Sequence, residues 1–278
     1  MERPSLYVVA TPIGNLADIT LRALEVLKRV DAIAAEDTRI TLRLLKHYGI
    51  SAPLIALHEH NERHAAQKIL RLLAQGRSVA LVSDAGTPAI CDPGAIAVAL
   101  VRQAGYPVVP LPGANAALCA LSAAGSAAPQ FLFYGFLPQQ AAARRRELAA
   151  LKAFPYPVVF YEAPHRVMAS VNDILAAFGA TRSITIAREL TKLFESIHTC
   201  TLGEAAAWFA ADANRSKGEF VLLVEGAAAG AEDAGAARRA LGILLRELPL
   251  KQAVKLAAEI GGGKRNELYR IALELKRR

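Results

Sequence analysis

The 278-residue sequence has few cysteines and lacks the common signatures of nucleotide-binding and hydrolytic enzymes. Cys91, Cys119 and Cys200 lie far apart without a C-x-x-C spacing, so we expect reduced thiols and no zinc site. No G-x-G-x-x-G follows the first apolar run, which disfavours an ordinary Rossmann dinucleotide site. The motifs G-x-x-x-x-G-K-[ST], G-x-S-x-G and H-E-x-x-H are also absent, which disfavours a P-loop NTPase, an α/β-hydrolase and a zinc protease.

The sequence also lacks long apolar runs and a secretory signal. Its first residues, MERPSLYVVATP, contain too short an apolar stretch for a signal peptide. No window approaches the roughly 20 apolar residues that a membrane-spanning helix needs. Apolar residues make up 53% and charged residues 21%, as in globular chains. We therefore expect a soluble, cytoplasmic protein, long enough for two domains and a small appendage.

Positive charge is concentrated at the end of the chain. Residues 1–237 carry 22 Lys/Arg and 21 Asp/Glu, whereas residues 238–278 carry 11 Lys/Arg and 4 Asp/Glu. A nearly neutral body with a basic tail indicates a polyanionic partner, and RNA or DNA fits better than a membrane.

Strand-like and helical patterns alternate along most of the chain. In residues 1–115 this alternation predicts a mainly parallel sheet covered by helices. Residues 116–226 contain further strand-like runs and favour a second α/β domain. Residues 227–237 have the composition of a linker, and residues 238–278 contain three helical stretches. The predicted fold is α/β: two α/β domains with a small C-terminal three-helix module of helix-turn-helix character.

Three loops rich in glycine and proline follow strand-like runs in the first half. They read ATPIGN, SDAGTPAICDPG and LPGAN. In α/β proteins such loops form ligand sites at the carboxyl edge of a sheet. Asp92 and Pro93 fit the N-cap and the first position of the helix that follows the second loop. Taken singly, these residues more often only turn the chain; together the loops indicate an enzyme.

Seven segments in chain order resemble the small-subunit rRNA methyltransferase I family, within the tetrapyrrole-methylase-like (class III) S-adenosylmethionine-dependent enzymes. They are ATPIGNLADIT, AEDTR, LVSDAGTPAICDPG, PLPGANAAL, FYGFLP, FYEAPHR and GEFVLLVEG. The resemblance spans about residues 5–226, and the basic tail looks like the family's C-terminal helical domain. It implies 2′-O-methylation of a cytidine ribose in the decoding region of 16S rRNA. It also implies a donor site in the cleft between the two α/β domains, and a homodimer.

The same resemblance implies where S-adenosyl-L-methionine binds. Small residues let a ligand approach backbone groups closely, as the donor's polar groups require. The second loop departs from the Gly-Asp-Pro that is usual in class III enzymes, because Ser83-Asp84-Ala85 stands in its place and keeps only the acid. The expected donor contacts are Pro12, Gly14, Asp84, Gly86, Thr87, Gly113, Ala114, Asn115, Tyr161 and Glu162.

Two groups of charged residues are candidates for the catalytic base, and the sequence does not choose between them. In the first group, Glu36 or Asp37 would accept a proton while Arg39 holds a phosphate. The alternative is that Asp37 only caps a helix and pairs with Arg39. In the second group, Glu189 would be the base and Lys192 would stabilise negative charge on the acceptor oxygen. The alternative is a solvated surface whose charges pair locally.

Basic residues of the tail are the expected contacts of the RNA backbone. They are Lys264, Arg265, Arg270, Lys276, Arg277 and Arg278, with Arg166 as a further phosphate contact near the cleft. Tyr269 would stack on a base or pack in a core. His58, His60 and His64 have no cysteine nearby in the sequence, and we expect no metal.

Two other functions remain possible from the sequence. One is a class III methylase of a tetrapyrrole or another small metabolite, which the basic tail disfavours because such a substrate needs no polyanion-binding appendage. The other is a non-catalytic RNA-binding protein, which the three loops disfavour because a pure binder needs no such cleft.

Overall fold

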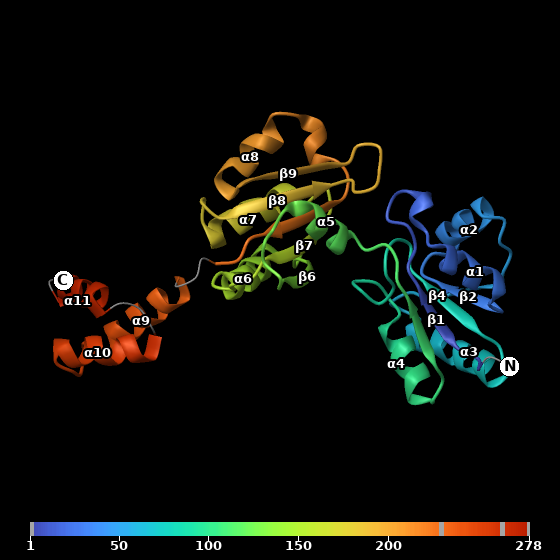
Figure 1. The fold of residues 1–278 in the computed structure, drawn as a ribbon, viewed down its shortest axis with the longest axis horizontal. Coiled ribbons are helices and arrows are strands. Elements are labelled where there is room, and N and C mark those ends of the chain that lie inside the picture. Colours follow the sequence, from blue (N-terminus) through green and yellow to red (C-terminus); the bar gives the residue numbers. More distant parts are fainter. Residues whose placement is uncertain (1–2, 228–230, 262–264, 277–278) are drawn as a thin grey trace.

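The computed structural model describes residues 3–227, 231–261 and 265–276, and it contains two five-stranded sheets followed by three helices (Figure 1). All strands of the first sheet are parallel, in the order β3-β2-β4-β1-β5. These strands are β1 (Leu6–Val9), β2 (Ala32–Ala35), β3 (Leu54–Ala56), β4 (Val79–Val82) and β5 (Val108–Leu111). The predicted parallel sheet is therefore confirmed.

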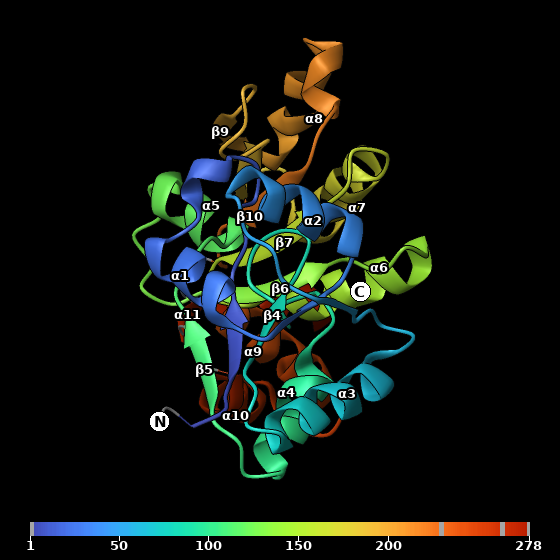
Figure 2. The same ribbon diagram turned by 90° about the vertical axis from the view of Figure 1, so that its right-hand side faces the viewer.

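Helices cover both faces of the first sheet (Figure 2). One face packs against α1 (Leu21–Arg29) and α2 (Thr38–His47), and the other against α3 (Glu62–Ala74) and α4 (Ala95–Gln103). A short 3-10 helix, η1 (Leu16–Asp18), lies between β1 and α1. Because crossover helices bury both faces, β2 and β4 are apolar at every position instead of alternating.

The start of α1 agrees with its sequence pattern, but its buried face differs in part. Thr20 is the N-cap, and its side chain accepts a hydrogen bond from the Ala23 N–H at 3.1 Å. Leu21, the first residue of the helix, is 79% exposed. The buried residues of α1 are Ala23, Val26 and Leu27.

Helix α4 begins two residues later than the sequence pattern predicts. Its N-cap is Gly94 with a φ of 133°, so the expected capping role of Asp92 is wrong. The cap comes instead from Glu62, whose Oε1 accepts hydrogen bonds from the backbone N–H groups of Gly94, Ile96 and Ala97 at 2.9, 2.6 and 3.1 Å. A buried carboxylate on three N–H groups satisfies the helix start, and Asp92 is left for another role.

The second sheet is mixed, in the order β6-β7-β10-β8-β9. Only the β6–β7 pair is parallel within it; β7–β10, β10–β8 and β8–β9 are antiparallel. Its strands are β6 (Leu132–Phe136), β7 (Val158–Glu162), β8 (Ser183–Arg188), β9 (Ser196–Thr201) and β10 (Phe220–Val224).

The helices of the second unit divide between the two faces of this sheet. Helix α5 (Ala116–Ala124) packs on the face that includes Val159 and Leu223. The opposite face carries the larger core, with α6 (Ala141–Leu151), α7 (Val167–Phe178) and α8 (Leu202–Ala210). A 3-10 helix, η2 (Ala213–Ser216), precedes β10.

Three further helices form a separate small core at one end of the molecule (Figure 1). They are α9 (Ala231–Leu244), α10 (Leu250–Gly261) and α11 (Arg265–Lys276). Helix α9 starts within the stretch predicted to be a linker, because its several alanines favour helix and outweigh its two glycines. In the part of the chain that the structure describes, no helix is long and apolar enough to cross a membrane.

Candidate active site

A cavity of about 370 Å³ lies between the two sheets, at the carboxyl ends of β1 and β4. The loops that follow strands of the first sheet, together with the start of α5, contribute Ile13, Asp84, Ala85, Gly86, Thr87, Ile90, Cys91, Asp92, Asn115 and Ala116. The second sheet and its loops contribute Phe136, Tyr161, Glu162, Ala163, Pro164, Ala187, Leu190, Glu219, Phe220 and Val221. A mainly apolar wall with a few polar groups is typical of a small-molecule site.

Hydrogen bonds hold the three predicted loops together at this cavity. Thr11 and Gly86 exchange two backbone hydrogen bonds of 2.9 Å, which join the first loop to the second. The Thr87 hydroxyl donates to the Ala114 carbonyl at 3.1 Å and joins the second loop to the third. Ser83 donates from its hydroxyl to the Gly86 carbonyl at 3.3 Å, so the residue that departs from the usual class III motif stabilises the same turn.

Two of the predicted glycines serve close packing between chain segments. A Cβ at Gly14 would lie 2.5 Å from Lys192 Cγ and 2.8 Å from Thr191 Oγ1. A Cβ at Gly113 would lie 2.7 Å from the Ala10 Cβ. The first loop is therefore pressed against the β8–β9 hairpin, and the Asn15 N–H donates to Thr191 Oγ1 there at 3.1 Å.

The structure brings six of the ten predicted donor contacts to the cavity. These are Asp84, Gly86, Thr87, Asn115, Tyr161 and Glu162. Pro12, Gly14, Gly113 and Ala114 are not on its wall. Gly14, Gly113 and Ala114 take part in contacts of the loops that form it, whereas Pro12 lines a smaller cavity nearby. The apolar wall residues Ile13, Ile90 and Phe136 lie within the segments singled out in the sequence but were not predicted as contacts, and Leu190 lies outside those segments.

Tyr161 forms a rigid part of the cavity wall. Its hydroxyl accepts a hydrogen bond from the Ala117 N–H in the first turn of α5 at 3.1 Å. Its ring contacts Phe133 and Phe136 edge-on, with centroid distances of 5.0 and 5.6 Å. Burial raises the pKa of Tyr161 to about 12, so the phenol is neutral at physiological pH.

Three carboxylates gather where β2 and β4 end. Asp84 Oδ1 accepts a hydrogen bond from the Asp37 N–H at 2.9 Å, and the Asp84 N–H donates to Glu36 Oε2 at 3.3 Å. Burial raises the pKa values of Glu36 and Asp84. Burial and the neighbouring charge of Glu36 raise the pKa of Asp92 to about 6. A carboxyl group with the pKa of Asp92 can exchange protons near neutral pH.

Asp37 and Arg39 pair with each other. Asp37 is the N-cap of α2 and accepts from the Arg39 N–H at 2.8 Å, and the Arg39 Nη2 lies 2.6 Å from its Oδ2. Hydrogen bonds from Arg39 lower the pKa of Asp37 to about 2, which makes it a weak base. The structure thus has the helix cap and local ion pair that were the alternative interpretation of these residues.

The second predicted group also forms a local ion cluster. Lys192 Nζ lies 2.9 Å from both Glu189 Oε1 and Glu219 Oε2. Burial alone would raise the pKa of Glu189, but hydrogen bonds from Lys192 and the Glu219 N–H outweigh it and lower that pKa. Glu189 is therefore poorly suited to accept a proton near neutral pH. The cluster adjoins the cavity between the two sheets, because Glu219 also lines that cavity.

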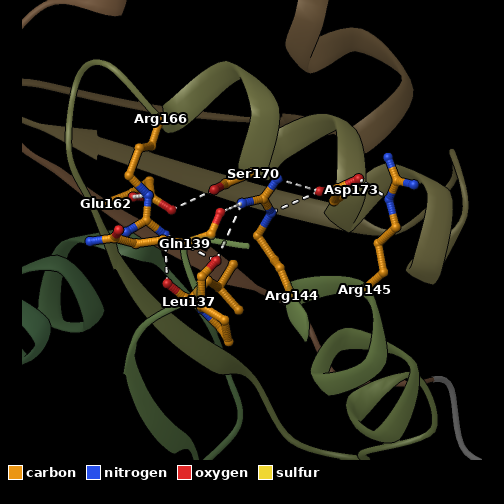
Figure 3. A network of polar contacts seen from close by, with 9 residues as sticks. Leu137, Gln139, Arg144, Arg145, Glu162, Arg166, Ser170 and Asp173 are labelled. Carbon is orange, nitrogen blue, oxygen red and sulfur yellow. Dashed lines mark hydrogen bonds and ion pairs between the residues drawn. The ribbon is translucent and has the colours of Figure 1, made fainter. Parts of the chain in front are cut away.

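Arg166, expected to contact phosphate, is engaged in a network inside the second unit (Figure 3). Its Nε lies 3.2 Å from Glu162 Oε1, and its Nη2 donates to the Leu137 carbonyl at 2.5 Å. Ser170 donates to the other oxygen of Glu162 at 2.5 Å. The carboxylate of Glu162 is thus bound within the protein, and only 16% of the Arg166 side chain is exposed. Both residues support the loop after β6.

The basic residues predicted to bind RNA are described only in part. Arg270 is exposed on α11, and Arg265 lies 3.4 Å from Glu259. Lys276 ends α11, but its side chain is outside the described part, as are Lys264, Arg277 and Arg278. Tyr269 is half-exposed. A hollow of about 600 Å³, which was not predicted from the sequence, is lined by Arg238, Arg239, Gly242, Ile243, Leu245, Arg246 and Leu275.

Residues 3–227, 231–261 and 265–276 contain no group of three or more His, Cys, Asp or Glu side chains arranged to hold a metal ion. The rings of His58 and His60 contact each other edge-on, with a centroid distance of 6.0 Å. They lie on a second cavity beside the first one.

Comparisons with known proteins agree with this architecture. The chain matches the sequence profile of the tetrapyrrole (corrin/porphyrin) methylases over residues 5–206 and that of the RsmI C-terminal HTH domain over residues 231–276. It is 56% identical to the ribosomal RNA small subunit methyltransferase I of Escherichia coli O157:H7, covering 97% of this chain and 94% of that protein. It is 50% identical to the protein of the same name from Pseudomonas aeruginosa, covering 99% of this chain and 98% of that protein.

Solved structures show the same fold at low identity. The methyltransferase CobJ aligns with a TM-score of 0.61 and 20% identity, covering 81% of this chain and 95% of that one. The uroporphyrin-III C-methyltransferase from Thermus thermophilus was solved in complex with S-adenyl homocysteine. It aligns with a TM-score of 0.56 and 17% identity, covering 80% of this chain and 97% of that one.

Proposed function

The chain belongs to the ribosomal RNA small subunit methyltransferase I family, and we propose that it methylates the 2′-hydroxyl of a cytidine in the decoding region of 16S rRNA, with S-adenosyl-L-methionine as donor. The similarity to proteins named for this activity carries the proposal, because it extends over 97% of the chain and includes the basic tail.

The cavity between the two sheets fits the methyl donor. Its volume of about 370 Å³ lies within the usual range for small-molecule sites. We propose that Ile13, Phe136 and Leu190 provide apolar surface for the adenine, and that Asp84, Thr87 and Asn115 bind the ribose and amino-acid groups. When bound, S-adenosyl-L-methionine supplies a methyl group activated by its positively charged sulfur.

The protein's own residues must align the acceptor and remove its proton. A ribose hydroxyl is a poor nucleophile at neutral pH, so placing it in line with the donor and deprotonating it both accelerate the transfer. Asp37 and Glu189 are weak proton acceptors, because their hydrogen bonds with Arg39 and Lys192 lower the pKa of each carboxyl group. Glu36 keeps a raised pKa and stays a candidate among the residues predicted from the sequence.

We propose that the C-terminal helices bind the RNA backbone. Arg238, Arg239 and Arg246 line one hollow together with the apolar side chains of Ile243 and Leu275. Arg265 and Arg270 are exposed on α11 and are proposed as further backbone contacts. From the sequence alone, Lys264, Lys276, Arg277 and Arg278 are proposed as well. Cationic contacts of this kind give affinity with little sequence choice, so cytidine must be selected at the cleft.

Three further features belong to this proposal. The domains divide as residues 1–115, 116–226 and a basic helical module, which α9 extends back to Ala231. The protein acts in the cytoplasm on 16S rRNA or the small ribosomal subunit. It forms a homodimer, which sedimentation of the purified protein can measure.

The direct test is methyl transfer from labelled donor to small ribosomal subunits and to protein-free 16S rRNA, both lacking the modification. Recovery of labelled 2′-O-methylcytidine is the expected result. Donor binding without transfer to either RNA would contradict the proposed substrate and favour a small-molecule methylase.

A further inference from the structure

The hollow on α9 in the C-terminal helical module combines two kinds of surface. It has a volume of about 600 Å³, and Arg238, Arg239 and Arg246 bring positive charge to it. The rest of its lining is apolar and consists of Gly242, Ile243, Leu245 and Leu275. The side chains of Ile243 and Leu275 belong to residues that are 66% and 38% exposed, so the apolar part of the hollow is open to solvent. Exposed apolar surface rimmed by charge is typical of a binding site.

Gly242 lies at the centre of this lining, at a position where the packing of the helix does not require a glycine. Arg238 precedes it by about one turn, and Arg246 follows it by about one turn, just beyond the end of α9. A Cβ at Gly242 would meet no atom within 4 Å, so no other segment packs closely against it. Glycine disfavours the interior of a helix relative to alanine. The missing side chain therefore leaves room for a ligand to approach the backbone of α9.

The arginines of the hollow present their charge to solvent. Arg238, Arg239 and Arg246 are all exposed, and no side chain that the structure describes forms a hydrogen bond or an ion pair with their guanidinium groups. Arg144 and Arg265, in contrast, each bind a carboxylate. A guanidinium group binds phosphate through paired N–H donors and also stacks on the flat face of a nucleobase. Arginines beside apolar surface thus fit both parts of a nucleotide.

These features distinguish between the possible occupants of the hollow. A second copy of this chain, related by a two-fold axis, would place the same arginines opposite each other, and the like charges would repel. A phosphate group alone would use the arginines but not the apolar lining. A base within a duplex has both faces covered by its neighbours in the stack, so only an unpaired base can enter.

We propose that the hollow binds one unpaired nucleobase of the RNA substrate, with the base against Gly242 and Ile243 and the adjoining phosphates on the arginines. This inference rests on the proposed function and adds to it, because phosphate contacts alone do not read a base. Stacking accepts any base, so the hollow recognises an unpaired nucleotide and not a sequence. The module is thereby directed to a loop, a bulge or a single-stranded stretch of 16S rRNA.

The test compares two RNA hairpins that differ only in one base. The first has a single bulged adenosine, and the second has an abasic residue at the same bulge. Both carry the same phosphates, so the difference in their affinities for the full-length protein reports the base alone. Wild type should bind the intact hairpin about tenfold more tightly, as expected for stacking of one base. Fluorescence anisotropy at a fixed salt concentration measures both affinities.

Gly242→Leu should abolish this difference between the two hairpins, because the new side chain fills the hollow. Leucine favours helix more than glycine does, so the melting temperature of the variant should not fall. The matched control is Gln252→Leu, which adds the same side chain at an exposed position of α10 that does not line the hollow. This control should keep the difference. A base bound in the cleft contributes equally in all these proteins, so it cannot produce the expected result.

Ile243→Ser tests the apolar wall without filling the hollow, and it decides the matter if Gly242→Leu melts at a lower temperature than wild type. Ile243 is 66% exposed and lies outside the core of the module, so this variant should fold. It should reduce the difference between the hairpins to about threefold or less, because apolar surface is lost. Arg239→Gln should instead weaken binding of both hairpins equally, because it removes a phosphate contact.

A difference between the hairpins that persists in Gly242→Leu and in Ile243→Ser overturns the inference, as does a wild type that binds both hairpins equally. In these cases methylation of 16S rRNA by the wild type leaves the proposed function standing. Loss of the difference in Gln252→Leu also overturns the inference, because the base would then be bound outside this hollow. A wild type that binds donor but methylates no RNA overturns the proposed function and the inference with it.

Discussion

Individual charged side chains behave differently here because of the groups that face them. Asp37 faces an arginine and has a lowered pKa, whereas Asp92 is half-buried near two other carboxylates and has a raised one. Arg144 and Arg145 are adjacent in sequence and bind the same carboxylate, Asp173, but their side chains are 6% and 68% exposed. Residues adjacent in sequence can thus differ widely in burial, and therefore in their contribution to stability.

The arginine pair gives a matched test of burial. Arg144 lies 2.6 Å from Asp173 and also donates to the carbonyls of Pro138 and Gln139 (Figure 3). Arg144→Ala should lower the free energy of unfolding by about 3 to 5 kcal/mol, because it leaves a buried carboxylate short of a partner. Arg145→Ala should cost less than about 1 kcal/mol. Urea denaturation measures both, and similar losses in the two variants would contradict this interpretation.

The raised pKa of Asp92 predicts a stability effect that depends on pH. In the folded state the carboxyl group prefers its protonated form, so its contribution is favourable at low pH and is lost as pH rises through about 6. Asp92→Asn cannot ionise and should have a higher melting temperature than wild type at pH 8. The difference should vanish near pH 4, and a difference independent of pH would exclude titration of Asp92 as its cause.

At the scale of elements, three loops and one hairpin form the donor cavity. The loops are joined by the Thr11–Gly86 and Thr87–Ala114 hydrogen bonds, and the β8–β9 hairpin contacts the first loop at Asn15. Their order along the chain was evident from the sequence. Their mutual contacts were not, because they join segments far apart in the chain.

Gly14 tests the contact between the first loop and the hairpin. Gly14→Ala places a Cβ 2.8 Å from Thr191 Oγ1 and 3.0 Å from the Leu190 carbonyl oxygen, so the two elements must separate. Since Leu190 lines the donor cavity, we expect donor affinity to fall about tenfold, equivalent to about 1.4 kcal/mol. The control is Gly242→Ala on α9, where a Cβ meets no atom within 4 Å. Calorimetry showing equal donor affinities for the two variants would contradict the expected effect.

At the scale of the whole molecule, the two-sheet body contains the donor cavity and the helical module carries the excess charge. The three helices have their own core, which includes Leu241, Val254 and Leu268. Donor binding and RNA binding should therefore be separable.

Removal of residues 231–278 tests this separation. Donor affinity should remain within about threefold, whereas the affinity for 16S rRNA should fall and depend less steeply on salt, because fewer phosphate contacts release counterions. Titrations of donor and RNA at two salt concentrations measure both effects. Unchanged RNA affinity would rule out the proposed role of the module, and lost donor binding would show that the two parts are coupled.

The helices and strands and their order along the chain could largely be predicted from local sequence patterns. Periodic apolar patterns, glycine and proline loops and the charge distribution are properties of short segments, so they predict the parallel first sheet, the three loops and the basic tail. The family resemblance rests on the same local segments. Of the ten donor contacts that it implied, six line the cavity between the two sheets, and Gly14, Gly113 and Ala114 lie in contacts of the loops around it.

Which polar side chains are held by hydrogen bonds or ion pairs, and which are not, could be seen only in the folded structure. Asp92 is available because Glu62, from a different helix, caps α4 in its place, and Arg166 is unavailable because Glu162 and the Leu137 carbonyl bind it. These outcomes depend on burial and on partners brought together by packing. A hydrogen bond or ion pair between distant segments leaves no periodic trace in the sequence, so the assignment of roles within the site required the fold.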